Sequence, residues 1–378
     1  MKTLYLHIGT PKTATTAIQS FCYDNRDVLE QHGYYYPMFD YQFENVQKYR
    51  NGHFLVCRVF DESHTRLPEK QEALTMQILG ELLAMFEQHD TIILSDEGIW
   101  NRGFFEDTHC WSKIQKGLVD KGILVKVIVY FRRQDDFLFS WWNQQIKEGM
   151  HPSSVMDWNE ITEKLPYIKL DYYGYLEQIA QYVGKDNILV RLFDRKEFVG
   201  GTIQEDFLDA IGLSLKEDFK INDVLSNLSL TKNDIEIKRA LNTLSGLDKK
   251  ENALFRKVLS QLSEESTDDR SVSMFSAEED AAFMQQFAEG NDKIAKEYMH
   301  RDEPMFQPAK NSQEKWTANN EQMVEDVVRF FGTITLQLMR ENEELKAELK
   351  TQKQHINNIR FKMQHPAKAI MNKIKRTE

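Results

Sequence analysis

The sequence predicts an α/β fold, a parallel sheet flanked by helices, with a C-terminal extension that is helical and forms a coiled coil. Two observations predict the sheet. Short apolar segments alternate with longer segments of helical spacing, and three of the apolar segments end in residues suited to ligand binding. One observation predicts the extension: from Phe331 onward, apolar residues recur at alternating spacings of four and three.

The first apolar segment, residues 4–8, ends abruptly at Gly9 and leads through Pro11 into a helical pattern, which predicts a strand, a tight loop and a helix. Apolar segments farther on predict strands at 31–37, 91–95, 123–131 and 187–193. Helical spacing between these segments predicts helices at 67–88, 107–120, 135–148, 172–183 and 203–211. This alternation indicates a largely parallel sheet covered on both faces.

Composition excludes several classes of protein. The net charge of -11 argues against nucleic acid as the main partner, because duplex binding needs a basic footprint. No apolar run approaches the ~18 residues of a membrane-spanning helix. Since Met1 and Lys2 lead directly into the first strand, we expect no signal peptide. The cysteines are few and lack metal-type spacing, which predicts reduced thiols in a cytoplasmic protein: Cys22, Cys57 and Cys110.

The loop after the first strand, GTPKTATT, has the composition of an anion site. A helix N-terminus offers unpaired N–H groups and a partial positive charge, and Lys12 adds a full charge. Hydroxyls of Thr13, Thr15 and Thr16 could donate further hydrogen bonds. The loop is P-loop-like but lacks a glycine immediately before Lys12, so it departs from the nucleotide triphosphatase pattern and ATP hydrolysis fits poorly. A plain turn with an exposed lysine remains the alternative.

Two other predicted strands also end in charged residues. Asp96 and Glu97 follow one strand, and Arg132 follows another. Because the carboxyl ends of parallel strands meet at one edge, we expect these residues near the loop of Lys12. Ser140 follows Arg132 by eight residues, and the two form a candidate phosphate site, a surface arginine and an unrelated helix serine being the alternative. One ligand with two anionic groups would explain both Lys12 and Arg132.

Two segments together resemble the cofactor motifs of sulfotransferases that use 3′-phosphoadenosine-5′-phosphosulfate (PAPS). HIGTPKTATT resembles their 5′-phosphosulfate loop, usually PKxGTT, and YFRRQDDFLFSWW resembles their 3′-phosphate element, an arginine at a strand end with a serine eight residues later. ILVRLFD followed by DFLDAIGL resembles the later strand and helix of the same fold. Two further segments resemble the C-terminal part of bacterial carbohydrate sulfotransferases: NLSLTKNDIEIKRALN and GNDKIAKEYMHRDEPMF. The resemblance covers residues 1–308. Ala14 stands where the family usually has glycine, and alanine is tolerated there if its φ is negative.

The resemblance implies a role for each matching residue. Lys12 would contact the bridging oxygen and the 5′-phosphate, while Arg132 and Ser140 would hold the 3′-phosphate. Phe193 would stack near the adenine, unless it is a core residue. The 5′-phosphosulfate would be held by the loop: Pro11, Lys12, Thr13, Ala14, Thr15 and Thr16.

Sulfuryl transfer to a hydroxyl needs a base and fixed positive charge at the leaving phosphate. Carbohydrate sulfotransferases commonly use a glutamate, so Glu97 is the first candidate. Asp96 is the alternative, and a plain helix N-cap is the non-catalytic reading of either. His53, in a polar turn, is the second candidate base, or else a structural histidine. Trp141 and Trp142 could line an acceptor cleft, or at least one of them could pack in the core.

The sequence therefore predicts a sulfotransferase that moves a sulfuryl group from PAPS to a hydroxyl of a carbohydrate, such as a cell-surface polysaccharide or a glycolipid. Lys12, Glu97 and His53 are its catalytic candidates, and no metal is required. Two alternatives stay open: a P-loop nucleotide kinase-like enzyme, and a non-catalytic scaffold that acts through its coiled coil.

The C-terminal part changes character after residue 310. We expect the sulfotransferase domain at 1–310, a linker and helix start at 311–330, a coiled coil at 331–365 and a basic tail at 366–378. With Leu338 and Leu345 at d positions, Asn342 falls at an a position, which favours a parallel two-stranded coil. This predicts a homodimer or homo-oligomer, a solvated helix packed on its own domain being the alternative. The tail is read as an ordinary charged tail, with peripheral contact to the inner face of the membrane as the alternative.

Overall fold

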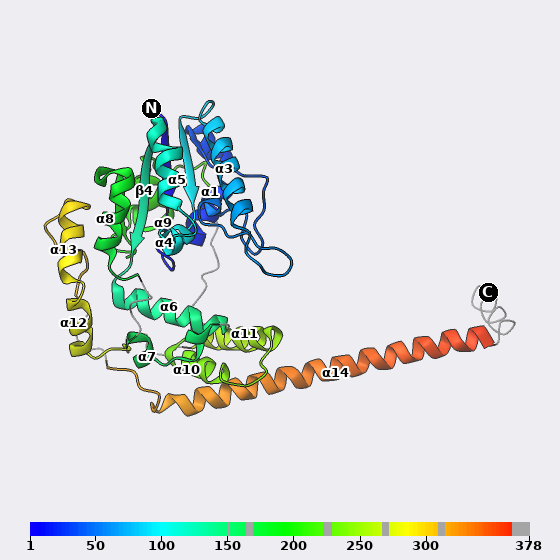
Figure 1. The fold of residues 1–378 in the computed structure, drawn as a ribbon. Helices are drawn as coiled ribbons and strands as arrows, with labels where there is room; N and C mark the ends of the chain where they lie inside the picture. Colours follow the sequence, from blue (N-terminus) through cyan, green and yellow to red (C-terminus); the bar gives the residue numbers. More distant parts are fainter. Residues whose placement is uncertain (150, 164–168, 222–228, 267–271, 309–313, 365–378) are drawn as a thin grey trace. The chain divides into compact units, whose positions relative to one another are not determined.

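The computed structural model describes the chain except for residues 150, 164–168, 222–228, 267–271, 309–313 and 365–378 (Figure 1). The chain divides into two compact units. The α/β unit comprises Met1–Asn227 and Asp269–Trp316, and the helical unit comprises Leu228–Asp268 and Thr317–Glu378. This division differs from the expected boundary at residue 310, because residues 228–268 group with the C-terminal helix. The predicted basic tail lies outside the described residues.

A five-stranded parallel sheet forms the centre of the α/β unit, in the order β2-β3-β1-β4-β5. Leu6 of β1 lies opposite Leu94 of β3 on one side and Val127 of β4 on the other. The predicted parallel α/β fold is confirmed. The strands are β1 (Thr3–His7), β2 (Tyr34–Tyr35), β3 (Thr91–Ser95), β4 (Leu124–Phe131) and β5 (Ile188–Leu192).

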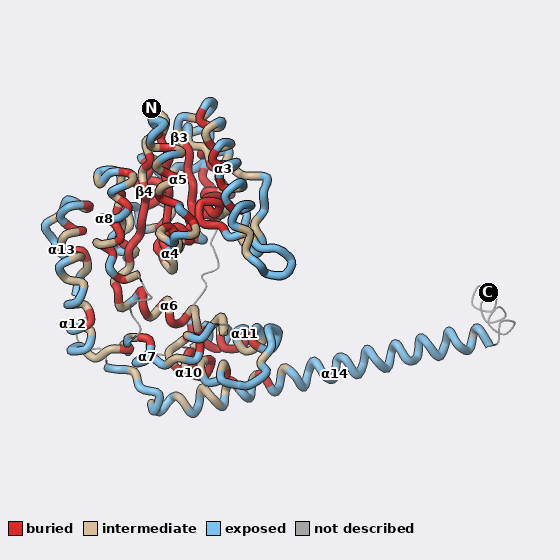
Figure 2. The backbone as a smooth tube through the Cα atoms, viewed as in Figure 1, coloured by how far each residue is buried: buried red, intermediate tan, exposed pale blue. Residues whose placement is uncertain are grey.

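Helices cover both faces of the sheet. Successive residues of each strand point to opposite sides, and apolar side chains on both sides need covering. Leu6 belongs to one core cluster, with Ile78 and Ile179 of helices α3 and α8, and Tyr5 belongs to the other, with Phe207 of α9. Figure 2 shows β3 and β4 as almost entirely buried. The helices of this unit are α1 (Thr15–Asp24), α2 (Arg26–Gln31), α3 (Pro68–Met85), α4 (Gly98–Arg102), α5 (Cys110–Gly117), α6 (Gln134–Glu148), α7 (Trp158–Glu163), α8 (Tyr172–Val183), α9 (Ile203–Ala210), α12 (Ala277–Gln285) and α13 (Ala288–Glu297).

The helical unit is built from α10 (Lys232–Leu241), α11 (Lys249–Glu265) and α14 (Gln322–Gln364). The N-terminal turns of α14 pack on α10 and α11 through the buried side chains of Phe330 and Ile334. Beyond these turns α14 is exposed (Figure 2). The helix begins before the predicted start of the coiled coil at residue 331. None of the helices in the described part of the chain is long and apolar enough to cross a membrane.

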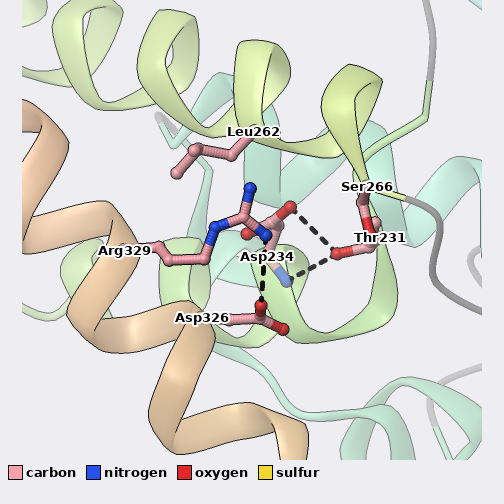
Figure 3. Close-up of a pocket in the computed structure, with 6 residues that line it drawn as sticks. All are labelled: Thr231, Asp234, Leu262, Ser266, Asp326 and Arg329. Atoms are coloured by element: carbon pink, nitrogen blue, oxygen red, sulfur yellow. Dashed lines mark hydrogen bonds and ion pairs between the residues drawn. The ribbon is translucent and has the colours of Figure 1, made fainter.

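A small polar pocket lies where α10, α11 and α14 meet (Figure 3). Inside it, the hydroxyl of Thr231 donates a hydrogen bond to the carboxylate of Asp234. Arg329 forms an ion pair with Asp326 of its own helix, at 4.0 Å. Burial raises the pKa of Asp234 above its ordinary value, and the hydrogen bonds from Ser263 and Thr231 act against that shift. The hydrogen bond from Ser263 to Asp234 joins α11 to α10, and the one from Asn233 to Asp326 joins α10 to α14. We therefore interpret the pocket as part of the helix packing.

Candidate functional site

The ends of three neighbouring strands form the candidate site. Because β1 lies between β3 and β4, the segments that follow these strands emerge at one edge of the sheet. They carry Gly9, the pair Asp96 and Glu97, and Arg132. A Cβ atom on Gly9 would lie 3.1 Å from the Cβ of Glu97, so the loop backbone passes directly against that carboxylate residue. Gly9 also has a φ of 101°, which favours glycine.

The loop after β1 is anchored by its own threonines. Thr10 donates its N–H at 3.0 Å and its hydroxyl at 3.1 Å to the carbonyl of Tyr130. Thr13 is fully buried, and its hydroxyl donates to the carbonyl of Thr10 at 2.6 Å. The hydroxyl proton of Thr13 therefore holds the loop together, and the expected donation from Thr13 to a ligand does not match this geometry. Thr15 is buried and Thr16 is exposed.

Ala14 adopts a left-handed backbone conformation, with φ at 55° and ψ at 30°. The condition under which alanine is tolerated there, a negative φ, is therefore not met. The reason is that Ala14 is the N-cap of α1, where the chain turns sharply from the loop into the helix; Lys12 also has a positive φ of 67°. A left-handed conformation costs an L-residue roughly 1–2 kcal/mol, which explains why glycine would suit this position better.

The N-terminus of α1 has the properties of an anion site. No side chain caps it, and its first turn contains no acidic residue. The first N–H groups of a helix have no partner inside the helix, and they carry a partial positive charge. Lys12 precedes this helix by three residues, so the positive charge of its side chain lies near the positive end of the helix dipole.

Lys12 lies between α6 and the end of β3. Its Nζ donates to Oε1 of Gln144 on α6 at 3.0 Å. Burial lowers the pKa of Lys12 below its ordinary value; the charge of Arg132 lowers it further, and the charges of Glu148 and Glu97 oppose the shift. The same interactions place Arg132 and Glu97 within electrostatic reach of Lys12. The structure thus brings together the three charged groups that the sequence predicts at one sheet edge.

Arg132 and Phe193 lie together, at the ends of β4 and β5. The guanidinium carbon of Arg132 is 5.3 Å from the ring centroid of Phe193. The backbone of Arg132 is held by the hydroxyl of Tyr172, which donates to its carbonyl at 3.0 Å. Ser140 is buried on α6, two turns into the helix that follows. The adjacent Arg133 is paired instead with Asp135 and Asp280, so the two arginines have separate roles.

Asp96 is the centre of a buried polar network. Arg50 donates to both of its carboxylate oxygens, at 2.9 and 3.0 Å, and the backbone N–H of Gly98 donates to it at 2.6 Å. Its other partner is Nδ1 of His53, at 3.1 Å. Burial by itself raises the pKa of Asp96, but the hydrogen bond from His53 and the charge of Arg50 outweigh it and lower that pKa to about 2. A fully buried carboxylate so placed is a poor base, so Asp96 positions its neighbours.

Glu97 is the carboxylate that a substrate could reach. Its side chain is 21% exposed, whereas that of Asp96 is 0% exposed. Oε1 lies 3.3 Å from Arg50, and Oε2 accepts from Gln19 at 2.9 Å. Glu97 is the N-cap residue of α4, but its side chain makes no cap hydrogen bond. Its position fits a base better than it fits a helix cap.

His53 is buried in a short 3₁₀ helix, His53–Leu55. Its Nδ1 faces Asp96, which orients the imidazole, and the centroid of its ring lies 5.0 Å from that of Phe43. The exposed ring of Tyr41 packs in turn on Phe43, with the centroids 4.9 Å apart. His53 therefore lies between the acidic network and an aromatic surface.

Several residues of this site were not predicted from the sequence. The carboxylate of Glu97 contacts Arg50 and Gln19, and the Nζ of Lys12 donates to Gln144. None of these three partners belongs to a recognisable sequence pattern. Arg50 directly precedes the polar turn that contains His53. This proximity in the sequence was the signal from which a place for Arg50 in the site could have been predicted. Trp142 is a core residue, because it is buried and its Nε1 donates to the carbonyl of Met156.

Comparisons with known proteins found similarities over part of the chain. No family model matches it. An uncharacterized protein of Archaeoglobus fulgidus is 32% identical over 177 residues, which cover 46% of this chain and 45% of that protein, so the chain spans less than half the length of this relative. A solved sulfotransferase from Alicyclobacillus acidocaldarius is 11% identical, with a TM-score of 0.34 over 63% of this chain and 92% of that chain. Neither similarity identifies a function.

Proposed function

We propose that the protein is a sulfotransferase that moves a sulfuryl group from PAPS to a hydroxyl of a carbohydrate. One observation carries the proposal: Lys12, beside the uncapped N-terminus of α1, has Arg132 and Glu97 within electrostatic reach. A site with two separate cationic groups and one carboxylate suits a donor with two anionic groups and an acceptor that must lose a proton.

The side chains at this edge have the chemistry that PAPS requires. The N–H groups of α1 and Lys12 would hold the 5′-phosphosulfate, because both favour an anion and no acidic residue lies in the first turn. Arg132 and Ser140 would hold the 3′-phosphate, and Phe193, already in contact with Arg132, would lie beside the adenine. PAPS supplies the activated sulfuryl group when it is bound.

The chain's own residues would carry out the proton and charge steps. Glu97 would accept the proton of the acceptor hydroxyl, while Arg50 and Gln19 hold its carboxylate in a defined orientation. Lys12 would stabilise the negative charge that develops on the leaving phosphate oxygen. His53, oriented by Asp96, is the second candidate for the proton acceptor.

The aromatic surface beside His53 supports a carbohydrate acceptor. Tyr41 is 46% exposed and packs on Phe43, which packs on His53. Aromatic faces provide apolar contact area with a polar edge, and this combination suits the faces of sugar rings.

Thermal-shift measurements test the nucleotide. We expect 3′,5′-ADP to raise the melting temperature without Mg²⁺, since a ligand at 100 times its Kd stabilises the folded state by about 2.7 kcal/mol. A shift with ATP and Mg²⁺ but not with 3′,5′-ADP would indicate a kinase-like enzyme, and no shift with either would favour the scaffold. Transfer of labelled sulfate from PAPS to a panel of glycans then tests the acceptor.

A further inference from the structure

One apolar face of the long helix α14 is buried against other described residues of the chain. Phe330 and Ile334 are buried against α10 and α11. A second row of side chains runs along another face, about 110° around the helix at 100° per residue. Its apolar members are exposed by 44% to 77%: Val324, Val328, Phe331, Leu338, Leu345, Leu349, Ile356, Ile359 and Met363. We call this row the seam.

The seam has heptad spacing over the whole of α14. It begins at Val324, seven residues before Phe331, and continues to Met363, one residue before α14 ends. Every residue from 341 to 360 is exposed, so this stretch is not buried against any other described residue. A lone helix in water draws little stability from hydrogen bonds alone and is normally stabilised by packing of its apolar face. A largely apolar face on such a helix, interrupted only at Thr335, Asn342 and Gln352, indicates a partner.

The charges that flank the seam identify that partner. With Asn342 at a and Leu345 at d, the g positions hold Glu341 and Glu348, and the e positions that follow hold Lys346 and Lys353. In a parallel, in-register pair of helices each g residue faces the e residue five positions later on the other helix. Glu341 would then face Lys346 of a second copy, and Glu348 would face Lys353. Both juxtapositions pair opposite charges.

Orientation and strand number follow from the same register. In an antiparallel pair g faces g and e faces e, which would bring glutamates together and lysines together. In the parallel, in-register pair Asn342 meets Asn342 of the other copy, and an asparagine at an a position favours two strands. We propose that the seam binds the seam of a second copy of this chain, and that the protein is a parallel, in-register homodimer through α14. This inference does not depend on the proposed activity.

Sedimentation of the full chain tests the partner. The expected mass is twice 44.5 kDa. Leu345→Glu combined with Leu349→Glu should give 44.5 kDa, because buried glutamates in the seam are unpaired. Ala347→Glu with Thr351→Glu is the matched control, since it adds the same charges outside the seam and should leave a dimer. A monomeric wild-type chain would overturn the proposal, and so would a trimer or tetramer.

Cysteine cross-linking tests the orientation. Asn342→Cys and Leu349→Cys, made as separate variants, should each form a disulfide-linked dimer on mild oxidation, because identical a positions face each other in a parallel, in-register pair. The native cysteines are buried, and Ala347→Cys on the far side of the helix should not cross-link. An antiparallel pair can bring at most one of the two positions against itself, so failure of either variant refutes the parallel register.

Charge reversal tests the flanking pairs. Glu341→Lys with Glu348→Lys should raise the dissociation constant of the dimer about tenfold or more, because four ion pairs become repulsive contacts. Lys346→Glu with Lys353→Glu should have a similar effect, and an equimolar mixture of the two variants should dimerise again. A charge-matched control is Glu343→Lys with Glu344→Lys, outside the seam and its flanks. Equal effects of control and test variants would contradict the pairing.

Discussion

The ligand edge of the sheet and the far half of α14 are opposite kinds of surface. At the sheet edge, charged groups are buried or partly buried, and residues distant in the sequence hold them: Asp96 is held by Arg50 and His53. Along α14 every residue from 341 to 361 is exposed, and an ion pair such as that of Lys346 with Glu343 stays within the helix. The first surface is preorganised by its own fold, whereas the second would bury its apolar seam in the proposed dimer.

Replacement of Lys12 should have the largest effect. Lys12→Ala should lower the rate of sulfuryl transfer about 10³-fold, because the charge that stabilises the leaving phosphate is lost. The rate with labelled PAPS measures this loss. The matched control is Lys350→Ala, an exposed lysine of α14 outside the seam, which should leave the rate unchanged. Wild-type turnover in Lys12→Ala would contradict the proposed activity.

Replacement of Asp96 should destabilise the α/β unit strongly. Asp96→Asn should lower the free energy of unfolding by about 3–5 kcal/mol, because the partly buried Arg50 loses its main counter-charge. Leu345→Ala, in the exposed half of α14, should change the unfolding of the same unit by less than about 0.5 kcal/mol. Denaturant unfolding measures both. A loss below about 1 kcal/mol in Asp96→Asn would show that the network is weaker than its geometry indicates.

Replacement of Glu97 should separate chemistry from binding. Glu97→Gln should lower kcat about 10²-fold, because the amide cannot accept the acceptor's proton. The Kd for 3′,5′-ADP should stay within a factor of two to three of the wild-type value, since Glu97 would contact the acceptor. Glu344→Gln on α14 provides the same chemical change at an exposed site. An unchanged kcat in Glu97→Gln would move the base to His53.

The pH dependence of stability should depend on His7, the last residue of β1. Burial lowers the pKa of His7 to about 3, and the charge of Asp96 opposes that shift. Below pH 6.5 the unfolded chain binds a proton that the folded chain does not, so stability present at pH 7 is lost as pH falls from 6.5 towards 3. The expected loss from His7 is about 2 kcal/mol by pH 5.

Denaturant unfolding at several pH values measures this loss. His7→Asn should remove it, whereas His355→Asn, on exposed α14, should keep the wild-type pH dependence. The Nε2 of His7 is buried and has no hydrogen-bond partner within the described residues, which agrees with a neutral ring. If the free energy of unfolding depended on pH equally in His7→Asn and in the wild type, the role of His7 would be refuted.

The smallest effect should come from Ala14. Ala14→Gly should raise the free energy of unfolding by about 1 kcal/mol, because glycine adopts a φ of 55° without a steric penalty. Ala17→Gly, inside α1, should have the opposite sign and lower it by about 1 kcal/mol. The two melting temperatures provide the check, and a fall in both would show that the left-handed geometry of Ala14 is not strained.

The sequence by itself determined the elements and their class. Apolar segments such as 123–131 match β4 (Leu124–Phe131), and the helical spacing at 135–148 matches α6 (Gln134–Glu148). Parallel strand direction was enough to predict that Lys12, Glu97 and Arg132 would lie at one edge. The heptad spacing of α14 could likewise be recognised in the sequence, because periodicity is a local property of the chain.

Only the tertiary structure decided the strand order, the φ of Ala14 and the division of labour between Asp96 and Glu97. Adjacent carboxylates are equivalent in a sequence, but Arg50, 46 residues away, holds Asp96 in the interior and leaves Glu97 partly exposed. The physical reason is that burial and pairing depend on which distant segments pack together, and no local pattern contains that information. The same reasoning explains why the heptad spacing of α14, a local property, could be recognised in the sequence, whereas the coiled coil itself stays a prediction.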